Sequence, residues 1–284
     1  MAKIEPIVME NTHSTHCLNC NTLLQGNFCH QCGQKVIDQK ERTLRYFILQ
    51  FFGSAFFLEN SFVKNLWQLI RSPGLMALDY AEGRRKRWMV PFSLFLLINL
   101  IYFIVNPLTD FNLPLYDHLR WHDTTYGPMA ARMVENRIQQ REIAFEEYER
   151  IFNAKTINLS KSLMVLNVPV MALLLSLIFF RKRKFFADHF IYALYLFSFF
   201  LLVSCIWIGL LNAYIWIGLP AYQFFVPTGL LLLTLYYVFF SLRRFYYVKN
   251  FLWSALSALG VFVAIGLMLY FYRFIMFMVT FAAT

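Results

Sequence analysis

The sequence predicts an all-α polytopic membrane protein with about five transmembrane helices, preceded by a small folded module near the N-terminus. Of its 284 residues 59% are hydrophobic, and the mean hydropathy is +0.50, whereas soluble domains contain roughly 45–50% apolar residues. The charged residues are clustered and leave long uncharged stretches, as a bilayer requires. The N-terminus has no basic start followed by an apolar run, so we expect no cleaved secretory signal.

The N-terminal module is predicted from two Cys-x-x-Cys pairs that eight residues separate: Cys17 with Cys20, and Cys29 with Cys32. Two such turns bring four thiolates to one point, which is the tetrahedral arrangement of a zinc ribbon. Asn21 and Gly33 follow the two pairs where the turn needs a positive φ, which asparagine and glycine tolerate. Residues 1–40 are therefore predicted to form a zinc ribbon with a tail.

The cofactor is expected to be one structural zinc ion per chain, because four thiolates fill the coordination sphere and leave no catalytic position. Iron in a rubredoxin-like site is an alternative. Two disulfides would suit an N-terminus outside the cell, but the charge pattern places it in the reducing cytosol. The nearby histidines are expected to be solvated or to contact the ligands rather than the metal: His13, His16 and His30.

Residues 41–87 are expected to form helices at the membrane surface and to end in a basic run. Residues 43–58 are apolar but too short to cross a bilayer. Residues 60–71 place apolar side chains on one helical face, and a Ser-Pro-Gly sequence at 72–74 then ends the helix. These helices either lie in the cytosolic interface or pack against the membrane bundle.

Five stretches of the predicted bundle, residues 88–284, are long and apolar enough to cross a membrane: 88–108, 159–180, 190–211, 222–240 and 251–272. Basic runs precede the first stretch and lie in alternate loops after it: Arg84 to Arg87, Arg181 to Lys184, and Arg243, Arg244 and Lys249. By the positive-inside rule the N-terminus is cytosolic and the C-terminus outside. This pattern, rather than nucleic-acid binding, explains the formal net charge of +10.

The predicted outer loop, residues 109–158, is long for a connection in a compact membrane protein. Within it, residues 129–152 place apolar side chains at helical spacing with charges between them. We expect one extracytoplasmic amphipathic helix. Its apolar stripe packs on the membrane surface or the bundle, or binds a partner.

A group of polar residues is predicted at the cytosolic rim of the membrane. Asp188 and His189 open the third predicted transmembrane stretch, and four further residues precede the first: Asp79, Tyr80, Arg84 and Arg85. Together they could bind a phosphate head group or a metal ion. The alternative is an interfacial histidine that caps a helix beside arginines of the positive-inside pattern.

Two features of the sequence narrow the range of possible functions. The centres of the five predicted stretches contain no charged residue, whereas pumps and coupled transporters usually place ionisable side chains there. Residues 11–34 contain no Lys, Arg, Asp or Glu, and a zinc ion with four thiolates is negatively charged. The ribbon is therefore not expected to bind nucleic acid, whose phosphates need cations.

Four motifs occur in a fairly specific order: the paired cysteines ending in Gly33-Gln34, the stretch from Arg71 to Arg85, Asp188-His189-Phe190, and Arg243-Arg244-Phe245-Tyr246. In these motifs the chain resembles a family of uncharacterised bacterial inner-membrane proteins, known only as a domain of unknown function. Members often carry further histidines after the one matching His189, where this chain has Tyr195 and Phe197. That departure argues against a histidine-rich metal site. The resemblance implies the fold and the bacterial inner membrane, but no activity.

We therefore expect a non-catalytic integral membrane protein that acts as an adaptor or accessory subunit of a membrane complex. Its expected partners are membrane lipids, and other proteins or further copies of the chain. The alternatives are a carrier or channel for a small or lipid-like solute, and a membrane enzyme acting on lipid head groups at the rim. A carrier needs a polar cavity at mid-membrane, and the enzyme needs one at the rim that contains His189.

Overall fold

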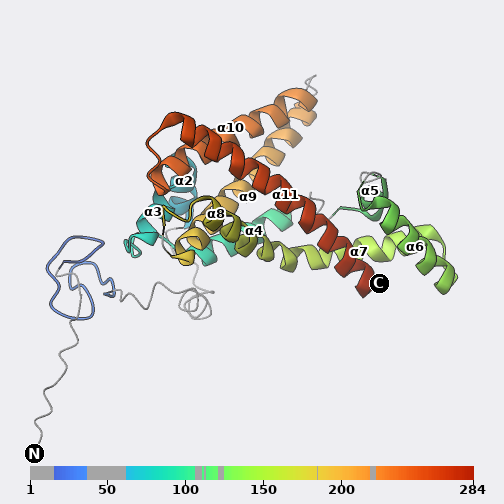
Figure 1. Ribbon diagram of the computed structural model, residues 1–284, viewed down its shortest axis with the longest axis horizontal. Coiled ribbons are helices and arrows are strands. Elements are labelled where there is room, and N and C mark those ends of the chain that lie inside the picture. Colours follow the sequence, from blue (N-terminus) through green and yellow to red (C-terminus); the bar gives the residue numbers. More distant parts are fainter. Residues whose placement is uncertain are drawn as a thin grey trace, which may run out of the picture.

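The computed structural model describes residues 16–36, 62–105, 111, 113–120, 125–183, 185–217 and 222–284. Within these ranges the chain is mostly helical and has no β-strand beyond isolated bridges in the N-terminal module (Figure 1). The helices are α2 (Phe62–Arg71), α3 (Leu75–Ala81), α4 (Pro91–Val105), α5 (Leu115–Arg120), α6 (Gly127–Arg141), α7 (Phe145–Leu163), the 3₁₀ turn η2 (Met164–Leu166), α8 (Asn167–Ile178), α9 (Phe186–Ile217), α10 (Tyr222–Phe245) and α11 (Phe251–Ala283).

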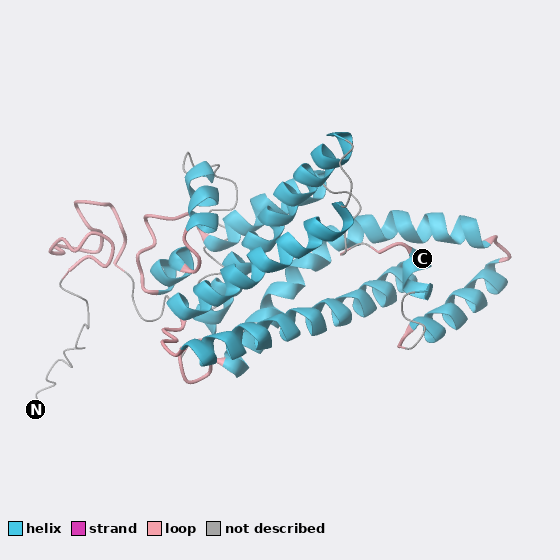
Figure 2. Cartoon of the chain, turned by 90° about the horizontal axis from the view of Figure 1, so that it is seen from above, coloured by secondary structure: helices cyan, strands magenta, loops and turns pink. Residues whose placement is uncertain are grey.

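Helix α9 is the central element of the bundle. It packs against α4, α8 and α10, and α11 lies against α8 and α10. Seen from above, the long helices of the bundle run side by side (Figure 2). Apolar side chains of α9 lie on every face of the helix, which is typical of a helix buried in a bundle. Residues 190–199 are accordingly all buried.

Three helical stretches are long and apolar enough to cross a membrane: Phe145–Ile178, Phe186–Leu210 and Phe251–Ala283. Helix α4 is apolar and has 15 described residues, and it begins at Pro91, after the start of the predicted stretch 88–108. Helix α11 has 33 residues and is about 50 Å long, whereas the hydrocarbon core is about 30 Å thick. The predicted end at residue 272 is thus not the end of the helix, because the backbone hydrogen bonds continue past Arg273.

A lobe at one end of the bundle has its own apolar core, and we call it the distal lobe. It comprises α5, α6, the first half of α7 and the last turns of α11 (Figure 1). The single helix expected over 129–152 is in fact two helices, because Glu142 takes a left-handed conformation (φ 55°) that ends α6, and α7 starts after Ala144. Helix α7 then continues through η2 into α8, across the predicted loop boundary at 158.

The other end of the bundle carries the short helices α2 and α3. Helix α2 ends at Arg71 as predicted, and it packs on α3 and α9, which agrees with the alternative that residues 60–71 pack against the bundle. Residues 43–58 lie outside the described residues. Helix α3, which the sequence did not predict, starts at Gly74 with a φ of 72°. A side chain at Gly74 would come within 2.7 Å of the Ser241 carbonyl oxygen, so α3 lies directly against α10.

Candidate metal centre and the basic end of the bundle

The two Cys-x-x-Cys turns have the same backbone geometry. In each, the first cysteine accepts a 2.8 Å hydrogen bond at its carbonyl oxygen from the residue after the pair, Asn21 or Gly33. These two residues have φ values of 61° and 69°, as predicted. The amide of the first cysteine donates in turn to the carbonyl oxygen of Thr22 or Gln34, again at 2.8 Å. Each turn is therefore shaped to present two sulfur atoms to one point.

The four cysteine sulfur atoms lie within 4.8 Å of one another. The Sγ atoms of Cys17 and Cys32 are 3.6 Å apart, and those of Cys20 and Cys29 are 3.5 Å apart. These distances far exceed the roughly 2.05 Å of a disulfide. A tetrahedral ion with metal–sulfur bonds of about 2.3 Å separates its ligands by about 3.8 Å. The four thiols thus fit a tetrahedral metal ion, a geometry that suits zinc and iron alike.

The four thiols differ in their surroundings. A hydrogen bond to Thr22 lowers the pKa of Cys20 to about 6, whereas burial raises the pKa of Cys17 to about 11. A cation between them would stabilise all four as thiolates. His16 and His30 are exposed and do not belong to the cluster of sulfur ligands among the described residues. His13 lies outside those residues.

The N-terminal module is attached to the bundle through the side chain of Gln34. This side chain is buried, and its Nε2 donates to the carbonyl oxygen of Gly83 at 2.8 Å. Its Oε1 accepts from the amides of Arg85 and Lys86 at 3.1 and 3.2 Å. One side chain therefore satisfies three backbone groups of the loop after α3. Gln34 ends the cysteine motif in the sequence, but nothing near it in the chain predicts this contact.

The same loop folds around the buried carboxylate of Asp79. Arg84 contacts Oδ1, with Nε at 2.8 Å and Nη2 at 2.7 Å. Trp88 donates from Nε1 to Oδ2 at 2.9 Å, and Nη1 of Arg87 is 3.4 Å from Oδ2. Arg84 also pairs with Glu82 at 2.7 Å. Burial acts to lower the pKa of Arg84, but its hydrogen bonds to Asp79 and Glu82 outweigh burial and raise that pKa.

The other basic segments lie at this end too. Arg183 donates from Nη2 to the carbonyl oxygen of Phe245 at 2.9 Å and lies 3.9 Å from Glu82. Arg244 donates to the carbonyl oxygen of Pro73 at 3.0 Å, and Tyr247 donates to Glu82. The three basic segments of the sequence thus meet at one end of the bundle, opposite the distal lobe. We call it the basic end: Arg84 to Arg87, Arg181 to Arg183, Arg243 and Arg244.

The polar residues predicted at the rim form two separate groups. Asp79 and Arg84 pair as described, and the guanidinium of Arg85 lies 5.2 Å from the ring centre of Tyr80. His189 is buried in α9 instead, where its Nδ1 is 2.9 Å from the Tyr246 hydroxyl. Asp188 lies beside it, in the first turn of α9. His189 contacts Tyr246 and the backbone of Arg183 rather than Asp79.

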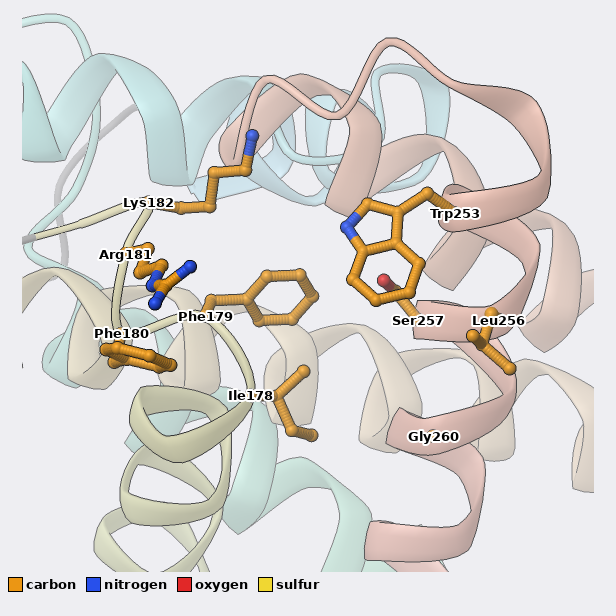
Figure 3. A pocket seen from close by; sticks show the side chains of 9 residues that line it. All are labelled: Ile178, Phe179, Phe180, Arg181, Lys182, Trp253, Leu256, Ser257 and Gly260. Carbon is orange, nitrogen blue, oxygen red and sulfur yellow. The ribbon is translucent and has the colours of Figure 1, made fainter.

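Two of the cavities that the described residues form lie between the helices. The larger, of about 440 Å³, is at the basic end between the end of α8 and the start of α11 (Figure 3). The smaller, of about 220 Å³, has a mainly aromatic and aliphatic lining from α4, α9, α10 and α11, to which Ser204 and Thr234 add hydroxyl groups. His189 lines neither of these two cavities.

Residues 59–103 match a family model described as a protein of unknown function (DUF3667). The matched segment includes α2, α3, the loop around Asp79 and most of α4. It therefore coincides with the part of the basic end that Gln34 contacts. No curated protein and no solved structure matches the chain.

Proposed function

We propose that this chain is a non-catalytic integral membrane protein, an adaptor or accessory subunit that holds a protein partner at the cytosolic face of the membrane. The observation that carries this proposal is the Gln34 contact. Through three hydrogen bonds it fixes the N-terminal module, residues 16–36 with their four cysteines, to the bundle. We call these residues the metal module. A four-thiolate site leaves no open coordination position for chemistry. The metal would therefore serve to keep the metal module folded.

The proposed metal is one zinc ion per chain, held by the four cysteines. Elemental analysis of the purified protein should find about one zinc per chain and no iron. The double variant Cys17→Ser, Cys29→Ser should lose the zinc, since it removes one ligand from each turn. Stoichiometric iron in the wild type would contradict the assignment.

The proposed orientation places the basic end in the cytosol of a bacterial cell and the distal lobe outside, with five crossings that include α4 and α10. It is supported by the meeting of three basic segments at one end, which the positive-inside rule assigns to the cytosol. Single cysteines at Glu135 in α6 and at Lys182, in a Cys205→Ala background, test it with a membrane-impermeant thiol reagent on intact cells. Position 135 alone should react. Reaction at position 182 would reverse the orientation.

The partner is expected to contact the exposed face of the metal module. Leu18, Leu23 and Phe28 are 40%, 56% and 62% exposed, and no charged residue lies between positions 16 and 34. An uncharged apolar surface fits a protein rather than a nucleic acid. Proteins that co-purify with the full chain should be lost when residues 1–40 are deleted, and also in Phe28→Ser.

The matched control for this experiment is His189→Ala in the bundle. We expect it to keep the partner and to support normal growth, because His189 is buried away from the module. A carrier or an enzyme would show the reverse pattern, with a harmless truncation and a severe His189→Ala defect. That reverse pattern would contradict the adaptor proposal.

A further inference from the structure

The cavity of about 440 Å³ at the basic end is not explained by the proposed adaptor role. Ligand sites commonly have volumes of roughly 300–1,000 Å³. The metal module does not line the cavity, and neither do Asp79 and its partners. Figure 3 shows that its walls come from the end of α8 with the loop that follows it, and from the first turns of α11.

The lining changes from basic to apolar along the cavity. Arg181 and Lys182 lie at one end (Figure 3). Along α11, Trp253 is followed by Ser257 and Gly260 on one helical face, because residues four and seven positions apart share a face. The Ser257 hydroxyl lies on the α11 wall beside Trp253, across the Phe179 ring from the basic residues (Figure 3). The cavity therefore presents positive charge at one end, and the rest of its lining is mainly apolar with one hydroxyl group.

Arg181 and Lys182 differ from their neighbour Arg183 in their contacts. Arg183 bonds to the Phe245 carbonyl oxygen, whereas Arg181 lies over the ring of Phe180 at 5.3 Å. Among the described residues neither Arg181 nor Lys182 forms an ion pair, and both are exposed. The lining contains no acidic residue. The side chains of Arg181 and Lys182 are therefore available to bind an anion at the mouth of the cavity.

We propose that this cavity binds one anionic phospholipid. Its phosphate contacts Arg181 and Lys182, and an acyl chain lies against Ile178 and Gly260. Trp253 is 57% exposed, and a tryptophan at the head-group level is typical of membrane proteins. The combination of cations and an apolar wall complements a lipid better than a free anion, which would leave the apolar half unfilled. The site does not depend on the proposed adaptor function.

Gly260 offers a way to block the site without disturbing the helix. A Cβ atom built at Gly260 meets no atom within 4 Å, and the same holds at Gly266. Both glycines lie in α11, but only Gly260 lines the cavity. Gly260→Leu should therefore fill the apolar part of the cavity, and Gly266→Leu is its matched control.

Native mass spectrometry of the full chain in mild detergent, titrated with phosphatidylglycerol or phosphatidylcholine, tests the proposal. The wild type should prefer phosphatidylglycerol by about twentyfold, since each basic residue near an anionic group contributes roughly fivefold. Arg181→Gln with Lys182→Gln should reduce this preference to about onefold to twofold, and Gly260→Leu should weaken binding of both lipids. Gly266→Leu should bind like the wild type.

A second control removes the same charge at the same end of the bundle but outside the cavity. Arg71→Gln with Lys249→Gln should keep the twentyfold preference, because these exposed residues do not line the cavity. Equal effects of the two double variants, or wild-type binding by Gly260→Leu, would overturn the proposal. So would displacement of the lipid by millimolar inorganic phosphate, which would show a site for a free anion.

Discussion

At the basic end of the bundle the buried carboxylate of Asp79 accepts hydrogen bonds from Arg84 and Trp88. The opposite end is held by packed rings, and its described residues form no buried ion pair. In the distal lobe the ring of Phe152 lies 6.0 Å from that of His118 and 5.9 Å from that of Phe277. Threonine hydroxyl groups join α7 to α11 there, through the 3.4 Å pair of Thr156 and Thr280.

The two ends differ in what a substitution should do. Removing the Asp79 charge from the basic end takes the charged acceptor away from its hydrogen-bond donors, whereas removing a ring from the distal lobe leaves a cavity. The basic end also carries the contact with the metal module, and the distal lobe does not. Variants in the two regions should therefore separate the stability of the fold from attachment of the module.

The largest expected effect is in the distal lobe. Phe152 is completely buried, so Phe152→Ala should destabilise the lobe by about 4 kcal/mol, because truncating a buried phenylalanine usually costs 3–5 kcal/mol. The decrease in stability is measured by unfolding the full chain in denaturant, with limited proteolysis of α6 and α7 as the readout. Phe145→Ala, at a position 36% exposed, should cost far less. Equal losses would mean that the lobe core is packed differently.

Asp79→Asn should destabilise the basic end by about 3 kcal/mol. It keeps the size of the side chain, but Arg84 and Trp88 lose a charged acceptor, and a hydrogen bond to a charged group contributes roughly 1.5–3 kcal/mol. The side chain of Asp79 is 3% exposed and that of its neighbour Glu82 is 27% exposed. Glu82→Gln should therefore cost less than about 1 kcal/mol. Thermal unfolding of both variants measures the two losses of stability. If Glu82→Gln loses as much stability as Asp79→Asn, Asp79 is not the residue that holds the loop together.

Gln34→Ala should have the smallest effect on overall stability, about 2 kcal/mol at most, because it removes hydrogen bonds from backbone groups that water can then reach. Its effect should be local. The amides of Arg85 and Lys86 should exchange with deuterium up to about thirtyfold faster, while amides of α7 keep their wild-type rates. Gln31→Ala, in the same module but at an exposed position, should leave all these rates unchanged.

Local signals predicted the metal module and the convergence of charge well. Two residues that tolerate positive φ, Asn21 and Gly33, mark the two turns in the sequence, and the backbone there has the expected conformation. The three basic segments could be predicted to lie on one side of the membrane, because the positions of charged residues are read from the sequence without knowledge of the fold. The match of residues 59–103 to a family of unknown function agrees with the resemblance for one of the four motifs, the stretch from Arg71 to Arg85.

Features that depend on tertiary contacts were not predictable. The partners of Gln34 lie about fifty residues further along the chain, and nothing local to Gln34 points to them. Helix α3 has only seven residues, too few for a periodic signal. The break at Glu142 requires a left-handed residue that is neither glycine nor asparagine. His189 and Asp79 were predicted to lie together because both were expected at the same depth in the membrane. Equal depth does not determine which side chains are in contact.

The central claim is the proposal that a metal ion held by the four cysteines keeps the metal module attached to the basic end. Hydrogen–deuterium exchange of the full chain, before and after a chelator strips the metal, tests it most directly, with metal loss checked by elemental analysis. The amides of Arg85 and Lys86 should lose protection on stripping, because the turn that positions Gln34 unfolds, while the amides of α7 in the distal lobe should not change. Unchanged protection of Arg85 and Lys86 in the stripped protein would contradict the claim.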